Sequence, residues 1–229
     1  MEGLPARVSV ERDDGWREEY AAGLYMNGAQ DWAPRTKAAL EAVEGRVLDV
    51  GAGAGRHARF LSARGCEVVA LDNSPGAVEA CRRQGLDAVL GAVGDPRLLV
   101  KERYDAVLLL GHNLGLLDSA EKAQDILSWL AERCVPGGVL LGDSLDTTIS
   151  AEPTWRAYNE RNRVGGRLPG ETRMRVSYEG RQGDWFAYWL VSPRELEAAT
   201  RHTSWEVERV DFDEDERFAG DYLATLRRR

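Results

Sequence analysis

Between residues 46 and 142, short apolar runs alternate with segments in which apolar residues recur at helical spacing. The apolar runs cover residues 46–50, 67–71, 87–90, 104–110 and 139–142. Residues 107–110 are apolar without interruption, which is typical of a strand buried on both faces. Strands and helices that alternate at this pitch form right-handed crossovers and a parallel sheet covered by helices on both faces. The sequence therefore predicts a doubly wound α/β core.

Length and composition limit the remaining possibilities. A chain of 229 residues is long enough for one α/β domain, and its 43% hydrophobic share supports a folded core. The net charge of −8 opposes attraction to a phosphate backbone, which argues against a nucleic-acid partner. No apolar run approaches the roughly 18 residues of a membrane span, and no secretory signal pattern is present. We expect a cytoplasmic protein with no membrane partner.

The cysteines predict neither a metal site nor a disulfide framework. Cys66, Cys81 and Cys134 are an odd number, and they lie far apart in otherwise apolar segments. Their spacing does not match the paired Cys or Cys/His patterns of metal sites. We expect three reduced thiols and no bound metal.

A glycine-rich turn follows the first apolar run. Gly51, Gly53 and Gly55 remove β-carbons where the backbone must turn tightly and where a ligand can approach it. The helix that follows presents free N–H groups and a positive dipole end, so an anionic group is expected there. The same glycine spacing also occurs in nicotinamide and flavin sites and in simple tight turns.

A carboxylate ends the second apolar run. Asp72 is followed by Asn73 and Ser74, and Ser74 is a suitable cap for the next helix. Neighbouring parallel strands end at the same sheet edge, where one carboxylate can accept from both hydroxyls of a ribose. Asp72 alone also suits a turn or a helix cap. Together with the glycine turn it predicts an adenosine-containing ligand.

These features resemble the class I S-adenosylmethionine-dependent methyltransferases, over roughly residues 46–146. Residues 48–55 look like the first family motif, residues 69–72 like its acidic strand end, and residues 134–140 like its Pro-Gly-Gly segment. Their order is more specific than any one of them. The resemblance implies a Rossmann-like seven-stranded sheet with an antiparallel last strand. It also implies S-adenosylmethionine as cofactor and in-line methyl transfer to an oxygen, nitrogen or carbon atom of a small molecule.

The resemblance also implies a set of cofactor residues. The methionine part would rest on the glycine turn, Asp72 would hold the ribose, and Asp49 would reach the ammonium group through water. Ala92 stands where the family has an acidic residue that meets the adenine, so we assign Asp95, three residues later, to that role. The whole predicted set is Tyr20, Asp49, Gly51, Ala52, Gly53, Asp72, Asn73, Ser74, Asp95 and Gly111.

His112 is the candidate catalytic base. The segment from Gly111 to Leu114 resembles the family's loop that borders the methionine and the substrate. A histidine there would take the proton of a hydroxyl or a protonated amine. Methyl transfer depends mainly on alignment and exclusion of water, so a base is optional. A loop histidine that only hydrogen-bonds to the backbone is an equally good interpretation.

We expect a single domain made of four segments. Residues 1–44 are interpreted as an N-terminal helical lid, residues 45–145 as the cofactor-binding core, and residues 192–229 as a closing helix and strand pair. Residues 146–191, between them, form an insertion with a predicted β-hairpin, much longer than a usual connection of about six residues. Its many aromatic residues predict one wall of an acceptor pocket, although they also suit packing within the hairpin.

Other functions remain open at this stage. The same fold serves non-catalytic adenosyl-ligand binders and partner subunits, and RNA or protein methyltransferases. A nicotinamide enzyme fits less well, because the turn reads GxGxG rather than GxGxxG and no second α/β half follows. The motifs that amino- and pyrimidine-methylating enzymes of nucleic acids use are missing from the sequence. A small-molecule methyltransferase is the leading hypothesis.

Overall fold

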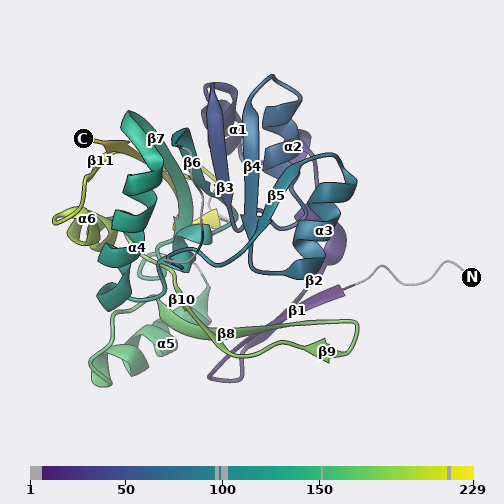
Figure 1. Cartoon of the computed structure of the whole chain (residues 1–229). Coiled ribbons are helices and arrows are strands. Elements are labelled where there is room, and N and C mark those ends of the chain that lie inside the picture. Colours follow the sequence, from purple (N-terminus) through teal and green to yellow (C-terminus); the bar gives the residue numbers. More distant parts are fainter. Residues whose placement is uncertain (1–6, 96–97, 99–102, 151, 216–217) are drawn as a thin grey trace, which may run out of the picture.

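The described part of the chain forms two β-sheets and the helices that accompany them. The computed structural model describes residues 7–95, 98, 103–150, 152–215 and 218–229. Seven strands form the central sheet, in the order β11-β12-β7-β6-β3-β4-β5, and five form a smaller sheet in the order β10-β8-β1-β2 with β9 paired to β8. Figure 1 shows the smaller sheet lying across one end of the central sheet.

The central sheet contains the predicted parallel core. Its five parallel strands are β3 (Arg46–Val50), β4 (Glu67–Asp72), β5 (Asp87–Leu90), β6 (Tyr104–Leu109) and β7 (Cys134–Leu145). The helices that accompany them are α1 (Pro34–Glu41), α2 (Arg56–Ser62), α3 (Pro75–Arg83) and α4 (Ala120–Arg133), with the 3₁₀ helix η3 (Asn113–Leu117) after β6. Parallel strands need such crossovers, so the doubly wound prediction is confirmed.

Two antiparallel strands close the central sheet. Helix α6 (Pro193–Thr200) begins with a capping box in which Ser192 and Glu195 satisfy each other's backbone N–H groups. Strands β11 (Trp205–Phe212) and β12 (Asp221–Arg228) follow, and β12 runs antiparallel to both β7 and β11. The last strand of the chain is therefore antiparallel, as the sequence predicts.

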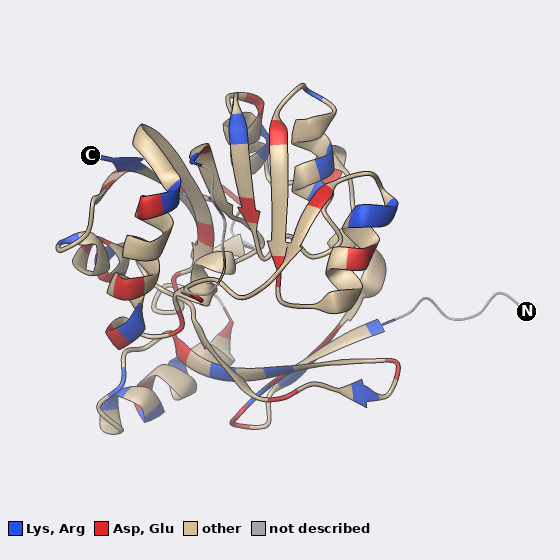
Figure 2. Ribbon diagram, in the orientation of Figure 1, with Lys and Arg blue, Asp and Glu red and all other residues tan. Residues whose placement is uncertain are grey.

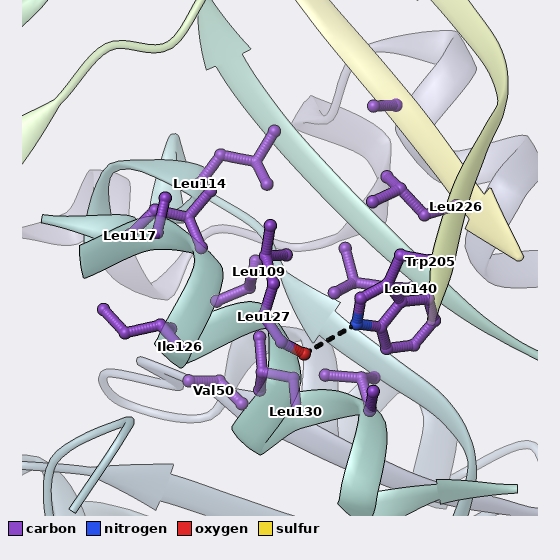
Figure 3. Packing of buried hydrophobic residues seen from close by; sticks show 14 of the residues in the cluster. Val50, Leu109, Leu114, Leu117, Ile126, Leu127, Leu130, Leu140, Trp205 and Leu226 are labelled. Carbon is purple, nitrogen blue, oxygen red and sulfur yellow. Dashed lines mark hydrogen bonds between the residues drawn. The ribbon is translucent and has the colours of Figure 1, made fainter. Parts of the chain in front are cut away.

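A core of aliphatic side chains holds α4 against the sheet (Figure 3). Leu127 and Leu130 of α4 are buried with Leu140 of β7 and Leu226 of β12. The indole Nε1 of Trp205 donates to the carbonyl of Leu127 at 2.8 Å. Each such side chain contributes about 1.5–3 kcal/mol by its burial. This packing fixes the strand ends that carry the candidate site.

The smaller sheet joins two segments that are far apart in the sequence. Strand β1 (Arg7–Arg12) runs antiparallel to both β2 (Arg17–Ala21) and β8 (Glu171–Tyr178). Strand β8 also pairs with β9 (Arg181–Gln182) and β10 (Phe186–Trp189), which confirms a hairpin in the insertion. Figure 1 shows purple β1 beside green β8.

The prediction of a helical segment at residues 1–44 is wrong for the two strands at residues 7–21. Val8 and Val10 alternate with polar residues, which is a strand pattern, and the edge of β8 supplies the hydrogen-bonding partners that β1 needs. Short 3₁₀ helices, η1 (Ala22–Met26) and η2 (Ala29–Asp31), then lead to α1. Among the described helices, none combines the length and apolar composition needed to cross a bilayer.

A buried arginine ties β1 to the insertion. Arg12 is 1% exposed, and its guanidinium forms two hydrogen bonds of 2.8 Å with Asp14. The same group lies 4.3 Å from the ring centroids of Trp155 and Tyr158 on helix α5 (Pro153–Val164). Desolvated cation–π contacts of this kind reach about 2 kcal/mol. The smaller sheet and α5 therefore form one unit.

Candidate active site

The glycine turn after β3 requires glycine at specific positions. Gly51, Gly53 and Gly55 have φ of 69°, 56° and 80°, in the left-handed region that β-carbons disfavour. A β-carbon on Gly51 would also stand 2.5 Å from Nδ2 of Asn113. The N–H groups of Gly51 and Ala52 donate to the carbonyl of Leu71 at 2.8 and 3.2 Å. The turn is thus locked against the end of β4.

Asp72 connects this turn to the next one. One carboxylate oxygen accepts from the N–H of Gly53 and the other from the N–H of Ser74, both at 2.8 Å. Ser74 caps α3 by accepting from Ala77, and Asn73 lies between Asp72 and this cap. Each carboxylate oxygen has a second lone pair for a ligand hydroxyl. Figure 2 shows the acidic residues at the ends of β3 and β4.

The turn has room for a ligand and a buried acceptor for its cation. A β-carbon built on Gly53 would meet no atom within 4 Å. Asp49, on β3, is 1% exposed, and its Oδ2 has no hydrogen-bond partner in the structure. Burial raises the pKa of Asp49 to about 7. Open space at Gly53 and a carboxylate oxygen without a partner at Asp49, four residues earlier, fit a ligand that carries an ammonium group.

The loop after β6 meets the glycine turn. The side-chain Nδ2 of Asn113 donates to the carbonyls of Val50 and Gly51 at 3.1 and 2.9 Å. Gly111 has a φ of 89°, and a β-carbon there would approach Nη2 of Arg56 to 3.3 Å. The structure therefore brings Gly111 and the glycine turn to one sheet edge.

His112 bonds to two carboxylates at this edge. Its backbone N–H donates to Oδ1 of Asp143 at 2.7 Å, and its Nε2 lies 3.1 Å from Oδ1 of Asp221. The imidazole is 45% exposed. Burial acts to lower the pKa of His112, but the hydrogen bond to Asp221 and the charges of Asp143 and Asp221 outweigh it, so this pKa lies above its ordinary value. The side chain thus pairs with a carboxylate rather than only with the backbone.

A cavity of about 830 Å³ separates His112 from the smaller sheet. Its aromatic wall includes Trp16, Tyr25, Trp32, Trp155, Phe186 and Tyr188. The hydroxyl of Tyr188 donates to the carbonyl of His112 at 2.6 Å, so the inserted hairpin contacts the loop after β6 directly. Not every aromatic residue of the insertion reaches the cavity, since Trp189 is buried and Trp185 stacks on Arg175.

Charged groups in the cavity wall are mostly acidic. Among the described residues, the carboxylates that line it are those of Glu18, Asp31, Asp143, Glu152 and Asp221, and the guanidinium groups are those of Arg35 and Arg56.

Both of these guanidinium groups already have partners. Arg35 forms an ion pair with Asp213, and Arg56 donates to the carbonyl of Leu24 at 3.1 Å and to Oδ1 of Asn27 at 2.9 Å. Burial lowers the pKa of Arg56 and raises that of Asp143. The five carboxylates outnumber these two guanidinium groups, so acidic groups predominate in the described part of the cavity wall.

Comparisons with known proteins agree with this geometry. A sequence model described as a methyltransferase domain matches residues 47–138. The malonyl-[acyl-carrier protein] O-methyltransferase of Enterobacter lignolyticus is 34% identical over 119 residues, which is 51% of this chain. The match spans about half of that protein, 46% of its length.

Solved structures extend the likeness to the whole fold. A methyltransferase from Bacteroides fragilis, in complex with S-adenosyl-L-homocysteine, superimposes with a TM-score of 0.79 at 25% identity, over 97% of this chain and 88% of that one. This chain contains a methyltransferase domain and has the fold of an S-adenosylmethionine-dependent methyltransferase. The predicted family is confirmed, and with it the enzyme class and the cofactor that the family uses. The CcbJ methyltransferase from Streptomyces caelestis shares the fold, with a TM-score of 0.62 at 19% identity over 84% and 92% of the two chains.

Two predicted cofactor residues of this methyltransferase lie away from the glycine turn's hydrogen bonds. Tyr20, on β2, lines the cavity, and its hydroxyl donates to Glu18 at 2.6 Å. Asp95 follows β5, and its carbonyl accepts from the indole of Trp129 on α4 at 3.2 Å. Their roles in cofactor binding remain predictions.

Sequence reasoning missed several residues of the methyltransferase site. Arg56 directly follows the third glycine, and Asp143 lies near the end of the fifth parallel strand, so both carried a positional signal. Asp221 begins an antiparallel strand, and nothing local marks it. The other residues missed are Arg35 and Asn113.

Proposed function

We propose that the protein transfers the methyl group of S-adenosylmethionine to a small molecule held in the cavity between the two sheets. One observation carries this proposal. The Asp72 carboxylate, bonded to the N–H of Gly53, stands beside an open glycine turn, and the loop of His112 joins that turn to the cavity. This arrangement supports a sugar-binding carboxylate on one side of the loop and an acceptor on the other.

The residues of the glycine turn and its surroundings fit the parts of the cofactor. Asp72 would accept from the ribose hydroxyls, and Asn73, Ser74 and Asp95 would border the adenine. The unpartnered Oδ2 of Asp49 would attract the ammonium group, directly or through water. When bound, the cofactor supplies an electrophilic methyl group on a sulfonium.

Arg56 is suited to the cofactor's carboxylate. It begins α2 directly after the glycine turn, and its side chain reaches the wall of the cavity beside Gly111. A helix N-terminus and a guanidinium both favour an anion.

His112 would act on the acceptor. When its Nε2–H donates to Asp221, the lone pair of the neutral ring lies on Nδ1, which can take a proton from the acceptor. The bonds from His112 to Asp143 and from Tyr188 to His112 hold the loop in place. The aromatic wall excludes water, and methyl transfer depends on such exclusion and on alignment.

A second candidate acceptor is an acyl group on a carrier protein, because the relative from Enterobacter lignolyticus is named for that substrate. A cytoplasmic location is part of the proposal, since Cys66, Cys81 and Cys134 are all free, as is usual in a reducing compartment.

Two measurements test the proposal. Titration calorimetry with S-adenosylhomocysteine should show one site per chain. Mass spectrometry should then detect demethylated cofactor when S-adenosylmethionine is incubated with acceptors that include amines, alcohols and malonyl carrier protein. Binding without turnover for any acceptor would favour a non-catalytic binder, and absence of binding would refute the proposal.

A further inference from the structure

The acceptor cavity has an unusual combination of linings, acidic at depth and aromatic on its walls. Asp221 is 17% exposed, and Asp143 is partly buried beside it on β7. Carboxylates in such a position lose hydration and require a compensating cation. The imidazole of His112 compensates them only when it is protonated.

We propose that the methyl acceptor is an amine, bound as its ammonium form beside Asp143, Asp221 and His112. This proposal rests on the proposed methyl transfer and specifies the acceptor's chemical class. It is independent of the question of which molecule carries the amine.

The two arginines offset the five carboxylates of the cavity wall only in part. Arg35 is engaged by Asp213, which does not itself line the cavity, and Arg56 is bonded to the segment before α1. Once Arg56 also holds the cofactor's carboxylate, the acceptor meets a wall that is negative overall. An acceptor with a free carboxylate, such as a malonyl group, would be repelled there, whereas an ammonium group would be attracted.

The mouth of the cavity has the same sign of charge. Glu18, Asp31 and Glu152 are exposed lining residues from three different segments of the chain. Negative charge around an opening raises the local concentration of cations and their rate of entry. The mouth and the depth of the cavity therefore select the same kind of molecule.

The aromatic wall contributes in the same direction. The cavity is lined by Trp16 of the turn between β1 and β2, Tyr25 of η1, Trp155 of α5 and Phe186 of β10. Aromatic faces attract organic cations, most strongly when water is excluded. They also leave room for an apolar or sugar-like body behind the nitrogen.

Methyl transfer to an amine needs no group beyond the cofactor, the acceptor and His112. Nδ1 of His112 takes one proton from the ammonium, which frees the nitrogen's lone pair. That pair forms the N–C bond to the methyl carbon as the C–S bond breaks, and the C–S electrons remain on sulfur. The product leaves as a methylated ammonium, and His112 returns its proton to solvent.

The pH response of His112 is set by its neighbours on four elements. Asp143 of β7 and Asp221 of β12 favour its protonated form, and Arg35 of α1 opposes it. Tyr188 of β10 donates to its backbone carbonyl and carries no charge, because burial raises the pKa of Tyr188 far above neutrality. Amine methylation should therefore increase as pH rises through the His112 pKa.

Three probes with one aromatic body test the inference. We would titrate 2-phenylethylamine, 2-phenylethanol and 3-phenylpropanoate into protein saturated with S-adenosylhomocysteine. The amine should bind at least about tenfold more tightly than the alcohol, and the carboxylate should bind most weakly. Equal binding of amine and alcohol, tighter binding of the carboxylate, or no measurable binding of the amine would overturn the proposal.

Two variants test whether the preference for the amine over the alcohol depends on the acidic pair, Asp143 and Asp221. Asp221→Asn should reduce the preference for the amine over the alcohol to less than about threefold, with unchanged affinity for S-adenosylhomocysteine. Asp143→Asn, which keeps an oxygen for the N–H of His112, is the second variant in case the first is unstable. Asp125→Asn, on the exposed face of α4, is the matched control and should change nothing.

The outcomes separate the two proposals. If S-adenosylhomocysteine binds and the amine shows no preference, only the amine proposal fails. If S-adenosylhomocysteine does not bind, the proposed methyl transfer fails with it. A preference for the amine that persists in both carboxamide variants would assign recognition to the aromatic wall and would contradict the role of the acidic pair.

Discussion

The cofactor side and the acceptor side of this site are built in different ways. Most of the proposed cofactor side comes from one stretch, β3 to the start of α3. Backbone N–H groups hold it together: that of Gly51 donates to the carbonyl of Leu71, and those of Gly53 and Ser74 donate to the carboxylate of Asp72. The acceptor side collects residues from β1, β2, α1, β7, α5, β10 and β12, and side chains hold it together. The cofactor, which is the same throughout the family, is thus matched by local backbone geometry. The acceptor, which differs between enzymes, is matched by side chains that can be substituted one at a time.

From this contrast we expect the largest loss of cofactor affinity on substitution of Asp72. Asp72→Ala removes the proposed acceptor of two ribose hydroxyls and the partner of Gly53, so affinity for S-adenosylhomocysteine should fall on the order of a thousandfold. Titration calorimetry measures this, with Asp87→Asn on β5 as a carboxylate control. Full affinity in Asp72→Ala would remove the basis for placing the cofactor here.

The next effect belongs to the acceptor side. His112→Gln should lower kcat on the order of a hundredfold and leave cofactor affinity within about threefold. Since a base must be neutral, kcat/KM of the wild type should fall as pH drops through a His112 pKa above 6.5. Asp221→Asn removes a charge that favours the protonated ring, so this decline should move to lower pH. A shift to higher pH would contradict the pairing.

Asp49 should make cofactor binding depend on pH. Its pKa of about 7 means that lowering the pH from 8 to 6 protonates it, and affinity for the ammonium-bearing ligand should fall roughly tenfold. Asp49→Asn should bind more weakly at pH 8 and lose this dependence between pH 6 and 8. An identical pH dependence in the variant would assign the titration to another group.

The smallest effect is expected at Tyr20, which lies between the cofactor side and the acceptor side. Tyr20 is predicted from the sequence to bind the cofactor, yet its hydroxyl donates to Glu18 in the cavity wall. Tyr20→Phe should therefore change affinity for S-adenosylhomocysteine by less than about threefold. A larger loss of affinity would show that Tyr20 of β2 takes part in cofactor binding.

The difference between local and long-range contacts also explains which features could be predicted from the sequence. The parallel core and the glycine turn follow from short-range patterns, because strand and helix periodicity and positive φ at Gly51 are local properties. The antiparallel last strand was predicted from the family resemblance. The pairing of β1 with β8 joins residues such as Val10 and Val176, and no local pattern specifies it. For the same reason the contact between His112 and Asp221, which are 109 residues apart in the sequence, was missed.

The shared hydrogen bonds of β1 and β8 also limit how acceptor specificity can be exchanged between related enzymes. A chimera that receives only the insertion would place a foreign β8 beside the host's β1, with unmatched side chains along the seam. Omitting β1 altogether would leave a bare strand edge, which invites association between chains. We expect a graft to fold only if the β1–β2 hairpin and the insertion are transferred together. A change of acceptor specificity in evolution would then require matched substitutions in two distant stretches of the gene.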